Sequence, residues 1–105
     1  MGQFSSGLNN PYVIETYSNE DGDWYRLYSD GWLEQGGSIG MTSGGTSKTL
    51  LKPYKDENFT LVGFNKAFSV NVRTYFSINS PRQIAGVFAS DGGAEAWFYA
   101  CGWGA

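Results

Sequence analysis

An Asp-Gly pair between two aromatic runs is the feature that most constrains this chain. The stretch WYRLYSDGWLEQGG, residues 24–37, places Asp30 and Gly31 near its centre. A type I′ turn needs positive φ at both central residues and Asp-Gly meets this need, so the pair predicts a two-residue hairpin loop. Further Asp-Gly pairs at 21–22 and 91–92 indicate similar turns. We therefore expect antiparallel strands joined by tight turns.

Alternating segments rich in aromatic and β-branched residues flank these turns, and helical periodicity is nearly absent. A chain of 105 residues has room for one domain. We assign residues 1–11 to a flexible lead-in or stalk junction and 12–105 to one all-β domain, a small antiparallel β-sandwich, jelly-roll-like. The Gly- and Ser-rich segment 36–47 is expected to be a loop or a weak edge strand. The predicted strands are 12–17, 24–29, 32–37, 47–52, 59–64, 70–79, 82–90 and 94–103.

The hairpin is expected to carry large apolar side chains on both faces. If Asp30 and Gly31 form the whole loop, alternation defines the two faces. One face would hold Trp24, Arg26, Tyr28, Leu33 and Gln35, and the other Tyr25, Leu27, Ser29, Trp32 and Glu34. A chain this short has little material for a second covering layer, so we expect other copies of the chain to cover the excess. The alternative is that Tyr and Trp tips reach solvent from a half-buried face. The residues assigned to the core or to oligomer contacts are Trp24, Tyr25, Tyr28, Trp32, Trp97 and Tyr99.

Several kinds of chemistry lack their usual residues. The chain has no His and one Cys, Cys101, which removes Ser-His and Cys-His nucleophile pairs, an intrachain disulfide and most zinc sites. The acids in 19–23 lack the ligand spacing of an EF-hand loop. We therefore expect no enzyme activity, no cofactor and no metal. The net charge of −3 argues against nucleic acid as a partner. No apolar run approaches the roughly 20 residues of a membrane helix, so no membrane insertion is expected.

Polysaccharide depolymerase activity remains an alternative, because a glycosidase needs only two carboxylates. Sequence alone does not show whether any two acids lie at the required separation. The candidates are Glu15, Glu34 and Glu95 on predicted strands, and Asp23, Asp30 and Asp91 near predicted turns.

Two stretches resemble the C-terminal domains of tailed-phage and prophage tail-fibre proteins. They are WYRLYSDGWLEQGG, preceded by YVIETY at 12–17, and the ending AWFYACGWGA at 96–105. The resemblance implies a homotrimeric knob at the distal tip of a longer fibre, in a virion protein assembled in the host bacterial cytoplasm. It also implies binding of a bacterial surface glycan or outer-membrane protein, with no catalytic set and no fixed binding residues. A structural domain that trimerises or caps a fibre is the alternative.

Receptor contacts are expected mainly in loops, because loops vary without disturbing the scaffold. The aromatic side chains are also suited to sugars, since a ring can cover the apolar face of a pyranose while polar groups fix its orientation. Among them Trp103 is the least committed to packing, because it follows Gly102 near the chain end. The candidate receptor-binding residues are Asn19, Asp21, Asp23, Arg82, Asp91 and Trp103.

Overall fold

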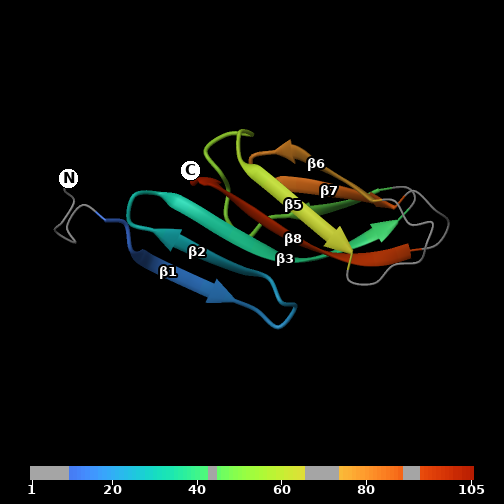
Figure 1. The fold of residues 1–105 in the computed structure, drawn as a ribbon, viewed down its shortest axis with the longest axis horizontal. Helices are drawn as coiled ribbons and strands as arrows, with labels where there is room; N and C mark the ends of the chain where they lie inside the picture. The colour runs from blue at the N-terminus through green and yellow to red at the C-terminus, as the bar shows by residue number, and fades with distance from the viewer. Residues whose placement is uncertain (1–9, 43–44, 66–73, 89–92) are drawn as a thin grey trace.

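The computed structural model describes residues 10–42, 45–65, 74–88 and 93–105, and these residues form eight β-strands (Figure 1). No helix occurs among the described residues. Each predicted strand overlaps one observed strand, so the all-β prediction is confirmed. The strands are β1 (Val13–Ser18), β2 (Trp24–Tyr28), β3 (Trp32–Thr42), β4 (Thr46–Thr49), β5 (Thr60–Asn65), β6 (Thr74–Ser80), β7 (Gln83–Phe88) and β8 (Gly93–Trp103).

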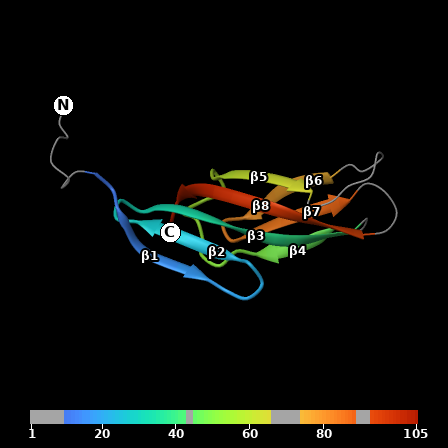
Figure 2. The same ribbon diagram turned by 60° about the horizontal axis from the view of Figure 1, so that its bottom comes forward.

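The strands form two antiparallel sheets, an arrangement compatible with a small β-sandwich. The larger sheet has the order β1-β2-β3-β8-β5, and the smaller has the order β4-β7-β6. A parallel pair between Thr42 and Val87 links them. Figure 2 shows β1 and β2 extending to one side of the smaller sheet. The outermost strand of the larger sheet, β1, is exposed along its whole length.

The longest strand pair joins β3 to β8, from Trp32 opposite Trp103 to Thr42 opposite Gly93. The prediction of a loop or weak edge strand at 36–47 is therefore wrong for residues 36–42, which continue β3 along β8. The glycine at position 36 serves close packing here, because a Cβ atom on Gly36 would come within 2.9 Å of the Trp24 indole nitrogen. A glycine in a strand interior commonly marks such a close approach.

The β2–β3 hairpin has a different register from the predicted one. Leu27 lies opposite Leu33 rather than opposite Glu34, so the predicted pairing is wrong by one residue. The backbone nitrogen of Gly31 donates to the Tyr28 carbonyl at 2.9 Å, and no residue other than glycine has positive φ among the described residues. This matches a type I turn followed by a left-handed glycine, not a type I′ turn. Because a slip of one residue exchanges the faces of a strand, a single face now carries Trp24, Arg26, Tyr28, Trp32 and Glu34.

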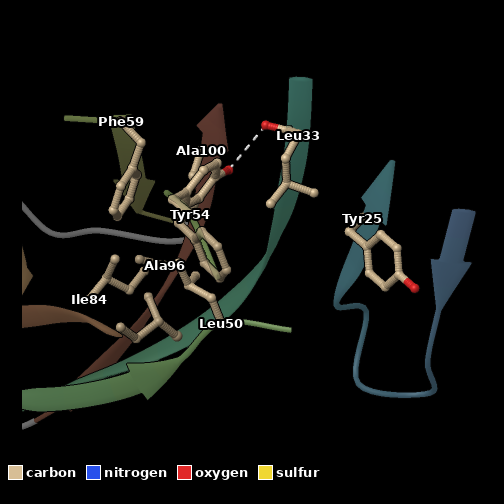
Figure 3. Packing of buried hydrophobic residues seen from close by; sticks show 10 residues of the cluster. Tyr25, Leu33, Leu50, Tyr54, Phe59, Ile84, Ala96 and Ala100 are labelled. Carbon is tan, nitrogen blue, oxygen red and sulfur yellow. Dashed lines mark hydrogen bonds between the residues drawn. The ribbon is translucent and has the colours of Figure 1, made fainter. Parts of the chain in front are cut away.

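The inner face of the larger sheet packs against the smaller sheet and against segment 50–59 (Figure 3). The rings of Tyr54 and Phe59 stack with centroids 4.2 Å apart, and the Tyr54 hydroxyl donates to the Leu33 carbonyl at 3.3 Å. Buried Gln35 donates to the Lys52 carbonyl at 2.9 Å and accepts from the Lys52 backbone nitrogen at 3.2 Å. The buried apolar core consists of Tyr25, Leu33, Ile39, Leu50, Tyr54, Phe59, Ile84, Ala96, Phe98 and Ala100.

Candidate functional site

The face of the larger sheet that points away from the core carries all four tryptophans of the chain. Leu33 and Ile39 are buried on β3, so the even-numbered residues of that strand point outward. Trp97 and Trp103 on β8 are 40% and 50% exposed. Among the described residues, the smaller sheet packs on the inner face and leaves this side open. We call it the outer aromatic face and define it as Trp24, Arg26, Tyr28, Trp32, Glu34, Val62, Phe64, Trp97, Tyr99 and Trp103.

Ring contacts between strands tie this face together. Trp32 meets Trp103 edge to face, with centroids 5.0 Å apart and an interplanar angle of 84°. Trp24 meets Tyr99 in a tilted arrangement with centroids 6.2 Å apart. Such cross-strand aromatic pairs stabilise a sheet and hold their rings in fixed positions. The face is therefore a preformed surface on paired strands rather than a set of loops.

The carboxylate of Glu34 lies between these two ring pairs. It accepts from the Tyr99 hydroxyl at 2.6 Å, from the Tyr28 hydroxyl at 2.8 Å and from Nη1 of Arg26 at 3.5 Å. The Tyr99 hydrogen bond is the main reason that the pKa of Glu34 is lowered. Burial, together with the negative charge of Glu34, raises the pKa of Tyr99. Glu34 is therefore an ionised acceptor at neutral pH, held in an aromatic setting.

The structure separates the six aromatic residues that were assigned to the core or to oligomer contacts. Tyr25 points inward, is buried and belongs to the core. The other five lie on the outer aromatic face, where Trp97 is exposed and the rest are half-buried. The face thus holds much apolar surface that the described residues do not cover.

The predicted receptor residues Asn19, Asp21 and Asp23 form the turn between β1 and β2. The Asn19 side-chain oxygen accepts from the backbone nitrogens of Asp21 and Asp23, both at 3.0 Å. Asp23 is buried, and its carboxylate oxygens accept from Nζ of Lys48 at 2.9 and 3.0 Å. The side chains of Asn19 and Asp23 thus hold the turn and attach it to β4, whereas Asp21 is exposed.

The other predicted receptor residues lie apart from this turn in the fold. Arg82 lies in the β6–β7 turn, where its guanidinium donates to the carbonyls of Leu50 and Leu51, both at 3.1 Å. Trp103 ends β8 and belongs to the outer aromatic face. Asp91 lies outside the described residues.

Neither Glu15 nor Glu95 forms a glycosidase pair with Glu34. Glu15 lies opposite Leu27 and accepts from the Tyr25 hydroxyl, so it belongs to the inner side of the sheet, and this hydrogen bond lowers its pKa. Glu95 shares the outward side, but the stretch of β8 from Cys101, opposite Glu34, to Glu95 spans about 20 Å at about 3.3 Å per residue. Catalytic pairs in glycosidases are about 5–10 Å apart.

No group of three or more His, Cys, Asp or Glu residues is placed to hold a metal ion among the described residues, which are 10–42, 45–65, 74–88 and 93–105. In those same ranges there is also no helix of the length and apolar character needed to cross a membrane.

The grouping around Glu34 was missed from the sequence because of the hairpin register. The two-residue loop placed Trp32 and Glu34 on one face and Trp24 and Tyr28 on the other. A three-residue loop, which also suits an Asp-Gly pair, would have brought these side chains together. No sequence signal marked Phe64, whose place on the face follows from its position opposite Trp97.

No protein-family model, no curated protein and no solved structure matches this chain. Its function must therefore be inferred from the outer aromatic face and from the sequence motifs that form it.

Proposed function

We propose that this chain is the tip domain of a phage or prophage tail fibre and that it binds a bacterial surface glycan without catalysis. The observation that supports this function is the outer aromatic face, where Trp24, Trp32 and Trp103 lie on either side of the ionised Glu34 carboxylate on an open sheet. Aromatic rings with a few fixed polar groups suit a sugar, because a ring covers the apolar side of a pyranose and polar groups orient it. This chemistry favours a glycan over an outer-membrane protein as the receptor.

The two tail-fibre-like motifs support the same proposal, because they meet on this face. WYRLYSDGWLEQGG forms β2 and the first part of β3, and AWFYACGWGA forms most of β8. These strands are neighbours, although the two motifs are about 60 residues apart in the chain. The proposed location is the virion, after assembly in the host bacterial cytoplasm.

Replacing an exposed tryptophan of the outer aromatic face with alanine tests the proposed glycan binding. We expect Trp97→Ala and Trp103→Ala each to weaken binding to cells of a susceptible strain by about tenfold or more, because aromatic anchors at a binding surface commonly contribute over about 1 kcal/mol. Tyr75→Ala is the matched control, since Tyr75 is 54% exposed but lies on β6 in the other sheet. Binding is measured by retention of labelled protein on whole cells and on a bacterial glycan array. Wild-type protein that is retained on neither would contradict the proposal.

We also propose that the domain assembles as a homotrimer, with contacts on β1. Ile14 is 56% exposed, and Tyr12 and Tyr17 are likewise exposed on or beside this edge strand. An open strand edge with apolar side chains favours association with another chain.

Placing a charged side chain on β1 by substitution tests the proposed trimer. We expect Ile14→Lys to convert trimers to monomers in light scattering at micromolar concentration, while the circular dichroism spectrum stays unchanged because the residue is exposed. Thr49→Lys, at an exposed position on β4 of the smaller sheet, should leave the trimer intact. A wild-type chain that is monomeric at every concentration tested would contradict the trimer. A trimer that binds no cells and does not compete with phage adsorption would identify a structural fibre cap instead.

A further inference from the structure

We infer that the outer aromatic face binds a neutral pyranose, which donates hydroxyl hydrogen bonds to Glu34, and rejects uronic and sialic acids. This inference rests on the proposed function and names the class of sugar. It places the sugar ring beside Glu34, over one of the two ring pairs, Trp24 with Tyr99 or Trp32 with Trp103.

Glu34 has acceptor capacity left for a ligand. An ionised carboxylate offers about four acceptor positions. Tyr28, Tyr99 and Arg26 use three, and the Arg26 contact is long at 3.5 Å. The Glu34 side chain keeps 20% of its surface exposed, so a hydroxyl group of a sugar can reach it.

The direction of the hydrogen bonds determines what the ligand must supply. The hydroxyl protons of Tyr28 and Tyr99 both point at Glu34, so these groups present lone pairs to a ligand. A ligand that supplies donors therefore fits this part of the face better than one that supplies acceptors alone. Sugar hydroxyls are donors, whereas a ligand carboxylate is an acceptor only.

The charges on the face also favour a neutral ligand. Its two charged members are Glu34 and Arg26, which form an ion pair, and the Arg26 guanidinium lies 5.3 Å from the centroid of the Trp24 ring. An acidic sugar would face the Glu34 carboxylate and a protein of net charge −3. An amino sugar would compete with Arg26 for the same carboxylate and the same ring. A neutral sugar disturbs neither charge.

The ring pairs provide stacking surfaces on both sides of Glu34. Trp32 precedes Glu34 by two residues on β3 and contacts Trp103. Two residues after Glu34 lies Gly36, over which Trp24 packs next to Tyr99. Because residues two apart on a strand are about 7 Å from each other, both ring pairs adjoin the carboxylate. A bound sugar ring can stack on either pair while its hydroxyls contact Glu34.

An array of purified bacterial surface polysaccharides, sorted into neutral ones and ones containing uronic or sialic acid, tests the inference. We expect the intact 105-residue chain to bind neutral members. Glu34→Gln should weaken that binding by about tenfold or more, the loss expected for a hydrogen bond to a charged group. Glu57→Gln is the matched control, since it makes the same charge change at an exposed position in segment 50–59 and should change binding less than about twofold.

The outcomes separate this inference from the proposed function. Binding confined to acidic polysaccharides would overturn the inference and leave the proposal of glycan binding intact. This outcome can be observed with the wild-type chain alone. A folded Glu34→Gln variant that binds neutral polysaccharides as tightly as the wild type would also overturn it. Binding to no polysaccharide and to no cells would overturn both.

Discussion

Phe98→Ala is expected to lower the free energy of unfolding by about 4 kcal/mol, the usual cost of removing a large buried aromatic side chain. Phe98 is only 5% exposed and lies in the middle of β8, opposite Gly37 and Gly63. Neighbours without side chains cannot fill the space that its ring would leave. The ring also lies 6.0 Å from Nζ of Lys48, so its loss would remove a cation–π contact as well. Urea unfolding followed by tryptophan fluorescence measures the change.

Phe64→Ala provides the matched control, because it removes the same ring from the opposite side of the same sheet. Phe64 is 56% exposed on β5. We expect it to change the free energy of unfolding by less than about 1 kcal/mol, as is usual for exposed positions. Equal losses in the two variants would mean that the outer aromatic face is buried in solution, for example by other copies of the chain.

Asp23→Ala is expected to cost roughly 3 kcal/mol of stability, because it leaves the partly buried ammonium group of Lys48 without its carboxylate. Both Asp23 oxygens accept from Lys48, which also donates to the Ser38 carbonyl at 2.8 Å. The same carboxylate accepts from the Ser38 backbone nitrogen at 3.4 Å. The change would therefore loosen the attachment between the β1–β2 turn, β3 and β4. Chemical denaturation at neutral pH gives the free energy.

Asp21→Ala is the control in the same turn. Its side chain is exposed, and the turn is held instead by the side-chain oxygen of Asn19. We expect a change within about 0.5 kcal/mol. If Asp23→Ala is as mild as Asp21→Ala, then Lys48 does not depend on Asp23 for its burial. If instead it abolishes cell binding at full stability, Asp23 is a receptor contact, as its position in a turn first indicated.

The strands could be predicted from the sequence because local patterns determine them. Alternating β-branched and aromatic residues, punctuated by Asp-Gly pairs, gave all eight segments. The exact hairpin register could not be read in this way. It depends on whether Asp30 adopts positive φ, and in the structure Gly31 alone does so in this turn. A difference of one residue in the loop then reassigned every side chain of β3 relative to β2.

The continuation of β3 was missed for a related reason. Residues 36–40, GGSIG, have the composition of a linker, and only long-range contacts show why a strand tolerates them. Trp24 packs over Gly36, and the carboxylate of Asp23 occupies the space where a Gly37 side chain would lie. These contacts come from a different strand and a different turn. Tertiary packing here overrides the local preference against glycine in strands.

The candidate site was only partly predictable. The sequence predicted that aromatic residues could serve a sugar and named Trp103 among the receptor contacts, and all of these aromatic residues except Tyr25 lie on the outer aromatic face. The turn residues Asn19 and Asp23 were predicted to contact a receptor. In the structure, the Asn19 side chain accepts hydrogen bonds from the backbone of its own turn, and the Asp23 carboxylate accepts from Lys48. The sequence indicated Glu34 only as a candidate catalytic acid, because its two tyrosine donors come from separate strands.

Because side chains alternate along β3 and β8, the residues on the two faces of the sheet can be changed nearly independently. On β3 the odd-numbered positions from Leu33 to Ile39 face inward, and on β8 the even-numbered positions from Ala96 to Gly102 do so. Substitutions at the intervening positions, other than Gly36 over which Trp24 packs, would change the exterior of the sheet and leave its interior intact. A mutational library restricted to those outward positions would therefore vary the proposed binding surface while preserving the fold.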